Sequence, residues 1–213
     1  GSAEASGLVV ERMTLKDNGL TQSQRLLETK PRVKGKYHFG GRLVYLNGYL
    51  FLTTGDGYFH PHLAQDLTAH QGKVLRIHDN GDIPIDNPFI EVEGALPEIW
   101  SFGIRSPQGL AVHPETEQVW ANEHGPQGGD EVNIISAGQN YGWPVITYGE
   151  EYGGGAIGEG ITRKEGLEQP LYYWLPSIGP SGMEIYSGRA FPGWKNSMFT
   201  GSLALKHLNR LVL

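Results

Sequence analysis

Residues 109–135 read GLAVHPETEQVWANEHGPQGGDEVNII, and this stretch contains three short apolar runs. The runs span 109–113, 119–122 and 131–135, and segments rich in Gly, Pro or polar residues separate them. Runs of about 4 to 8 residues that contain β-branched and aromatic side chains and lie between turn residues are typical of β-strands. The stretch therefore predicts three successive strands.

Ten further runs of the same kind extend this pattern to both sides, and no segment predicts an amphipathic helix. They span 8–15, 24–29, 42–46, 50–54, 74–78, 99–104, 171–175, 183–187, 198–203 and 208–213. The 31 Gly and 13 Pro are spread between the runs and indicate many tight turns. An all-β sandwich, barrel or propeller is expected. Propeller blades hold four strands, so thirteen strands give about three blades with one strand left over.

Two long segments interrupt the strands, at 56–72 and 148–166. Each follows a strand as a rim loop would, and long connections in compact domains are usually functional. We expect both segments to lie over the same face.

Composition limits the possible partners. The formal charge of −6 and the absence of a Lys/Arg run argue against nucleic acid and anionic membranes, which need a basic surface. No apolar stretch approaches the length of a membrane span, and no signal peptide is evident in this chain. Without Cys, a disulfide framework and a thiolate metal site are excluded. A small molecule is the favoured partner.

The absence of three common cofactor and nucleophile motifs excludes several kinds of enzyme site. The chain has no nucleotide-type glycine loop, no Gly-x-Ser-x-Gly elbow and no His-Glu-x-x-His helix. A redox role would therefore use a cofactor other than a nicotinamide bound in the usual way.

The segment 123–131, EHGPQGGDE, is the most informative candidate site. A turn this rich in Gly can direct backbone carbonyls inward, and such oxygen donors beside Asp130 and Glu131 suit Ca²⁺. The alternative is an ordinary glycine turn with solvated carboxylates.

Two further side chains are candidates for chemistry. His38 stands at the entry to a predicted strand beside glycines, where it is a general base or a hydrogen-bonded structural residue. Arg105 ends another predicted strand, where it stabilises an oxyanion, binds a carboxylate or forms a surface salt bridge.

Read in order, these segments resemble the soluble quinoprotein glucose and aldose sugar dehydrogenases, the glucose/sorbosone dehydrogenase family. The resemblance runs from about Leu8 to the last residue. The matching segments are 38–43 (HFGGRL), 54–56 (TGD), 72–76 (GKVLR), 83–88 (IPIDNP), 103–110 (GIRSPQGL), 123–131, 140–144 (NYGWP) and 180–183 (PSGM).

The resemblance implies a six-bladed β-propeller with pyrroloquinoline quinone (PQQ) on its axis. Residues 1–213 would be a single partial propeller domain that lacks the N-terminal and C-terminal blades. His38 would remove the proton from the sugar C1 hydroxyl as hydride passes to the quinone, and Arg105 would lie near the quinone oxygens. Gly125 and Pro126 would offer carbonyls to a Ca²⁺ ion that contacts the cofactor.

Further calcium ligands are implied at Asp130, Glu131 and the carbonyl of Tyr141. The chain also departs from the family motifs. Ser106 replaces an Asn that would reach the cofactor, and Gln127 replaces an Arg in the glycine turn. Ala204 replaces a Lys that contacts the quinone, and Lys206 is a candidate substitute because strand alternation would place it on the same side.

The implied activity is PQQ- and calcium-dependent oxidation of an aldose at C1 to the lactone, with electrons passed to an acceptor. One alternative is a truncated, inactive calcium-binding propeller fragment, and another is a calcium-dependent lactone hydrolase. The resemblance also implies a periplasmic or secreted protein. Because an incomplete propeller exposes strand edges, we expect a homodimer or another self-association that covers them.

Overall fold

The computed structural model describes residues 5–212 and confirms the predicted all-β class. The only helices among these residues are the short 3₁₀ helices η1 (Pro61–Gln65) and η2 (Pro192–Trp194). Neither has the length or the apolar character required to cross a bilayer. The thirteen strands described are β1 (Val9–Lys16), β2 (Gly19–Glu28), β3 (Gly40–Leu46), β4 (Tyr49–Thr54), β5 (Lys73–His78), β6 (Ile99–Phe102), β7 (Pro107–Val112), β8 (Val119–Glu123), β9 (Asp130–Ile135), β10 (Tyr172–Trp174), β11 (Pro180–Ile185), β12 (Met198–Ser202) and β13 (Leu208–Leu211).

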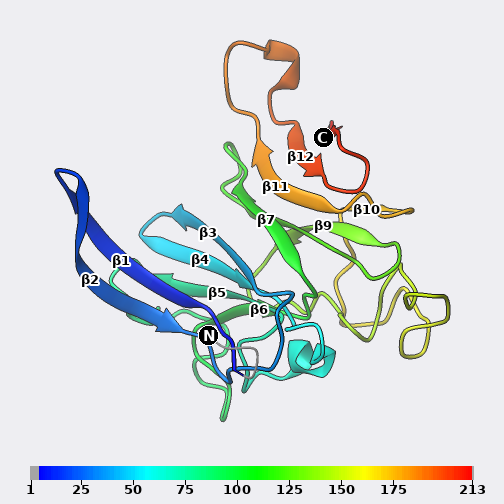
Figure 1. Cartoon of the computed structure of the whole chain (residues 1–213), viewed down its shortest axis with the longest axis horizontal. Coiled ribbons are helices and arrows are strands. Elements are labelled where there is room, and N and C mark those ends of the chain that lie inside the picture. Colours follow the sequence, from blue (N-terminus) through cyan, green and yellow to red (C-terminus); the bar gives the residue numbers. More distant parts are fainter. Residues whose placement is uncertain (1–4, 213) are drawn as a thin grey trace.

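The strands form four antiparallel sheets in which sequence neighbours are also sheet neighbours. The sheets are β1–β2, β3–β6, β7–β10 and β11–β13. The first strand of the third sheet, β7, packs between β3 and β11, and the sheets fan outward from these three strands (Figure 1). This is the arrangement of propeller blades. The strands divide as two, four, four and three, whereas the sequence predicted three full blades and one extra strand.

The apolar core consists of three layers, each between two sheets. Side chains alternate along a strand, so one strand serves two layers. In β8, Val119 and Ala121 pack toward the β3–β6 sheet, whereas Trp120 packs toward the β11–β13 sheet. The third layer lies between the β1–β2 hairpin and the β3–β6 sheet and includes Leu27 and Leu75. Both faces of the inner sheets are buried, and their strands bury polar side chains such as Lys73, Asn122 and Asp130 among the apolar ones.

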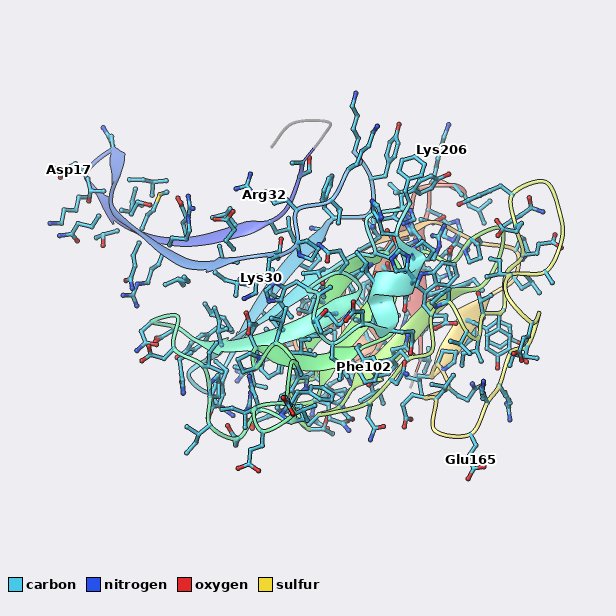
Figure 2. The ribbon with its side chains drawn as sticks, turned by 90° about the horizontal axis from the view of Figure 1, so that it is seen from below. Asp17, Lys30, Arg32, Phe102, Glu165 and Lys206 are labelled. Carbon is cyan, nitrogen blue, oxygen red and sulfur yellow. The ribbon has the colours of Figure 1, made fainter. Side chains whose placement is uncertain are left out.

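The two long connections meet at one end of the sheets, as predicted. Asp56 and Pro61 from the first connection line the same cavity as Glu151 and Ile157 from the second. The β1–β2 hairpin projects away from this body, with Asp17 at its tip (Figure 2).

Candidate functional site

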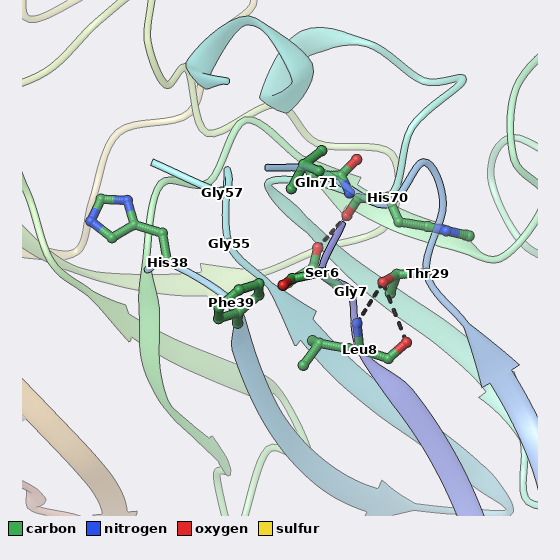
Figure 3. Close-up of a pocket in the computed structure, with 12 residues that line it drawn as sticks. Ser6, Gly7, Leu8, Thr29, His38, Phe39, Gly55, Gly57, His70 and Gln71 are labelled. Carbon is green, nitrogen blue, oxygen red and sulfur yellow. Dashed lines mark hydrogen bonds between the residues drawn. The ribbon is translucent and has the colours of Figure 1, made fainter. Parts of the chain in front are cut away.

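His38 lies at this end of the sheets and has an unusual backbone conformation. It lies just before β3 with φ 55°, in the left-handed region that non-glycine residues seldom adopt. A side chain at Gly55 would collide with the His38 carbonyl, so the close approach requires glycine there. Behind His38 lies a small cavity of about 10 Å³, and the His38 ring points away from the residues around it (Figure 3). The contact with Gly55 therefore fixes the His38 backbone on the side of the small cavity, while the imidazole points to the opposite side.

Asp56 orients the imidazole. Its buried carboxylate lies just beyond β4, and Oδ1 is 2.8 Å from His38 Nδ1. The same carboxylate accepts hydrogen bonds from Tyr58 N and from Trp143 Nε1, each at 2.8 Å. A proton on His38 Nδ1 is shared with Asp56, which leaves Nε2 as the acceptor. From sequence, Asp56 was only part of the matching segment 54–56 and was not singled out as a site residue; its position directly after a buried strand was the available signal.

Arg105 lies between β6 and β7 and is buried. Its Nη1 donates to the carbonyls of His124 at 3.0 Å and Gly125 at 2.6 Å. Its buried Nε has no hydrogen-bond partner among the described residues. The guanidinium carbon lies 5.2 Å from the centre of the Trp143 ring. A buried cation with an unused donor is suited to an anionic or carbonyl-bearing ligand.

One cavity of about 230 Å³ brings these residues together. It is lined by His38, Asp56, Tyr58, Pro61, Arg105, Pro126, Trp143, Pro144, Glu151, Tyr152 and Ile157. Three residues singled out from separate sequence segments, His38, Arg105 and Pro126, thus face one space. Gly125 is joined to the cavity through its hydrogen bond with Arg105.

A third cavity, of about 10 Å³, lies beside Arg105 and is lined by Glu123, Gly125, Glu131 and Tyr141 among others. Glu123 and Glu131 are directly opposed in the β8–β9 register. Burial raises the pKa of Glu123 to about 7 and that of Glu131 to about 8. The negative charge of Glu123 also raises the pKa of Glu131. Two buried carboxylates around so small a space favour a cation. Glu123 was not predicted as a site residue.

Asp130 does not line any of these three cavities. Its Oδ1 accepts hydrogen bonds from Gly125 N and Ser177 Oγ, and its Oδ2 accepts from the backbone N–H groups of Ile178 and Gly179. Its geometry is that of an anchor for the glycine turn rather than of a metal ligand. Within residues 5–212 no three His, Asp or Glu side chains converge as a metal cluster. The predicted ligands Gly125, Pro126 and Tyr141 would contribute carbonyl oxygens instead.

The structure does not bring Ser106 and Lys206 into the His38 cavity. Ser106 is buried, and its Oγ accepts a hydrogen bond from Gln108 Nε2 at 3.1 Å. Lys206 is exposed in the connection between β12 and β13. The expectation that Lys206 shares a strand face with Ala204 is wrong, because β12 ends at Ser202 and residues 203–205 form a turn.

Comparison with known proteins decides the family. The sequence model of the family described as glucose/sorbosone dehydrogenase matches residues 1–213. The chain belongs to this family. An aldose sugar dehydrogenase of Escherichia coli, YliI, is 47% identical over 186 residues, which cover 86% of this chain and 50% of the relative. Quinoprotein glucose dehydrogenase B of Acinetobacter calcoaceticus is 29% identical over 190 residues, covering 65% of this chain and 39% of that protein.

Solved structures of glucose/sorbosone dehydrogenase type share the fold. A crystal structure of a glucose dehydrogenase superposes with a TM-score of 0.95 at 42% identity and covers 100% of this chain and 62% of that chain. The PQQ-bound aldose sugar dehydrogenase of Streptomyces coelicolor gives a TM-score of 0.73 at 27% identity, covering 100% and 57%. The chain spans about half the length of the curated relatives that it matches first.

Proposed function

We propose that this chain carries the sugar-oxidising centre of a PQQ- and calcium-dependent aldose dehydrogenase, which converts C1 of the sugar to the lactone. Family membership supports sugar oxidation, and relatives named as quinoprotein or PQQ-bound enzymes support the cofactor. The observation that carries the proposal is that His38, oriented by Asp56, faces the same cavity as Arg105.

His38 acts as the general base. With Nδ1 bonded to the Asp56 carboxylate, Nε2 accepts the proton of the C1 hydroxyl as the carbonyl of the lactone forms. Asp56 stabilises the imidazolium that results, and its bond from Trp143 Nε1 keeps the carboxylate in place. When bound, PQQ supplies the acceptor for the hydride that leaves C1.

The cavity residues fit such a cofactor. The Trp143 face and the buried Arg105 Nε suit a planar, anionic ring system. The Gly125 carbonyl accepts one bond from Arg105 and keeps a second lone pair, so Gly125 and Pro126 remain able to hold a calcium ion. Calcium there would act as a Lewis acid toward the cofactor carbonyl. Glu123, Glu131 and Tyr141 line the space for a further ion, which the Tyr141 carbonyl would help to bind.

The first experiment is a titration of the purified chain with PQQ, with and without Ca²⁺, followed by the quinone absorbance. Calcium-dependent binding near one PQQ per chain, with aldose-dependent dye reduction that H38A abolishes, would support the proposal. H207A is the matched control, because His207 is exposed and lies outside the cavity. Calcium-dependent binding without dye reduction would indicate an inactive fragment, and lactone hydrolysis without quinone would indicate a hydrolase.

The cellular location and the use of an electron acceptor are proposed from the family resemblance. We expect export to the periplasm or the medium and a separate electron acceptor. Fractionation of cells that make the protein tests the first expectation.

A further inference from the structure

Gln127 occupies the glycine turn at a position where the family motif has Arg, and it ties that turn to the long connection after β9. Its side-chain Nε2 donates to Glu150 Oε1 at 2.8 Å, and its Oε1 accepts from Gly153 N at 3.2 Å. The backbones of Gln127 and Glu150 also exchange two hydrogen bonds, at 3.0 and 3.1 Å. One exposed side chain and a two-residue antiparallel bridge therefore dock residues 150–153 on the turn.

The docked segment lies at the mouth of the His38 cavity. Glu151, Tyr152 and Ile157 line the cavity from the side of this segment, and His38 and Asp56 line it from the β3–β4 side. Glu151 N donates to Gly155 O, and Gly154 N donates to Glu151 O, each at 2.9 Å, so the segment closes on itself. Tyr148 is anchored by its hydroxyl bond to Gln169 Oε1 at 2.7 Å and by stacking on Tyr173, and Ile157 is buried. Between these two anchors, glycines 153–155 have positive φ and open space around them, so the bonds of Gln127 are what tie the middle of the segment to the glycine turn.

We propose that residues 148–157 form a strap that Gln127 holds across the cavity mouth, and that Glu151 and Tyr152 on the strap contact the sugar. This inference rests on the proposed sugar oxidation. The Glu151 carboxylate accepts hydrogen bonds from sugar hydroxyls, attracts an ammonium group and repels a carboxylate. The Tyr152 ring, 64% exposed, provides a flat apolar face for the C–H side of a sugar ring. The strap therefore selects neutral and amino aldoses over sugar acids.

The docking is tested by chymotrypsin cleavage after Tyr152, which does not depend on activity. Q127A removes two hydrogen bonds to the strap, so we expect cleavage about tenfold faster than in the unchanged chain. Q24A is the matched control, since Gln24 is an exposed glutamine of β2 whose bonds go to Arg12 and Asn80. Equal cleavage rates for Q127A and Q24A would overturn the docking.

The sugar contact is tested by kcat/KM of the PQQ-loaded chain for D-glucose, D-glucosamine and D-glucuronate. We expect E151Q to lower the glucosamine-to-glucose ratio and raise the glucuronate-to-glucose ratio, each about fivefold or more, through loss of one nearby charge. We expect Y152A to raise KM for all three sugars. E159Q is the control, because Glu159 is exposed on the same connection and does not line the cavity.

The outcomes separate the two proposals. Oxidation of glucose with ratios that E151Q leaves unchanged would overturn the sugar contact alone. Failure of the unchanged chain to oxidise any aldose with PQQ and Ca²⁺ would overturn the proposed function and the sugar contact together. Cleavage after Tyr152 would still decide whether Gln127 holds the strap.

Discussion

The positive φ of His38 and the buried carboxylate of Asp56 belong to one local arrangement. Strained backbone persists only where the surroundings fix it, and here Gly55 leaves room for the His38 carbonyl while Asp56 holds the ring. The arrangement presents one imidazole nitrogen to the cavity in a defined direction. Such pre-orientation is what a general base needs before substrate arrives.

Replacing Asp56 with Asn should therefore lower kcat for sugar oxidation by about 100-fold, because the amide neither stabilises the imidazolium nor fixes the tautomer. PQQ affinity should change little, since the amide oxygen of the introduced asparagine can still accept the hydrogen bond from Trp143 Nε1. D66N is the control; Asp66 lies on the same connection, and its side chain bonds only to Thr68. A D56N variant with full kcat would contradict the role of His38 as oriented base.

The pair Glu123 and Glu131 makes stability depend on pH. Their pKa values in the folded chain, about 7 and about 8, lie above the ordinary value of 4.5, so the folded state binds more protons than the unfolded state between about pH 5 and 8. The free energy of unfolding should fall as pH rises through this window, and Ca²⁺ should reduce the fall because it replaces the protons.

Urea unfolding at pH 5, 6, 7 and 8, with calcium or with chelator, measures this dependence. E131Q should flatten the profile, whereas E165Q, at an exposed site on the second long connection, should leave it unchanged. A profile in chelator that is flat for the unchanged chain would show that the two carboxyls do not titrate as described.

Site residues could be predicted from sequence where the residue type itself indicates a role within a matching segment. His38, Arg105, Gly125 and Pro126 stand in recognisable segments, and the structure gathers them. Asp56 and Glu123 were missed because their significance depends on partners 18 and 8 residues away, across a turn and across a sheet register. Burial of a carboxylate is a property of packing that composition does not reveal.

Lys73 organises the connection between β4 and β5. It is fully buried at the start of β5, and its Nζ donates to the carbonyls of Leu63 at 2.7 Å, Ala64 at 3.1 Å and Gln71 at 2.6 Å. These carbonyls belong to η1 and the chain after it, and η1 begins with Pro61, which lines the His38 cavity. One ammonium group thus fixes a wall of the cavity.

Replacing Lys73 with Met should lower the free energy of unfolding by about 2–4 kcal/mol, because three buried carbonyls lose their donor. PQQ affinity should fall as well, since the wall at Pro61 loosens. Denaturant unfolding and the PQQ titration measure the two effects. K164M is the control, because Lys164 is exposed on the second long connection; equal stability of both variants would contradict this role.

All thirteen described strands overlap the runs predicted from sequence, because each contains apolar or β-branched residues between turn segments. Several predicted boundaries differ from the structure: β2 begins at Gly19 rather than 24, β11 spans Pro180–Ile185 rather than 183–187, and β12 ends early. The run 198–203 was predicted to continue the strand through Leu203, but β12 ends at Ser202. Main-chain bonds from Leu203 N to Gly179 O and from Ala204 N to Ile178 O hold this turn against the segment directly before β11, and the period of two along a strand does not predict such a contact.

Two sheets of the described chain are left with fewer strands than a propeller blade. The β1–β2 hairpin pairs with no further strand, and β13 pairs only with β12. Leu15, Leu20 and Leu208 on these strands are 71%, 66% and 64% exposed. Unpaired edges beside exposed apolar side chains favour pairing with another strand.

We therefore expect the purified chain to associate with itself, completing a ring of blades or covering the open edges in another way. Light scattering at micromolar concentration should give a mass above that of one chain, and L15K combined with L20K should shift it toward the monomer. A monomeric mass for the unchanged chain would contradict the expectation. Lysine on the exposed hairpin is chosen because charges on edge strands oppose pairing.

The three separate layers of the apolar core affect the order in which the chain should unfold. Each core layer lies between two adjacent sheets, so each sheet packs only against its neighbours, as repeats do in a repeat protein. The outer sheets can then separate while the middle interface, between the β3–β6 and β7–β10 sheets, persists. His38, Asp56 and Arg105 lie in connections directly before or after strands of these two sheets. The reactive groups therefore lie on the part of the chain that should unfold last.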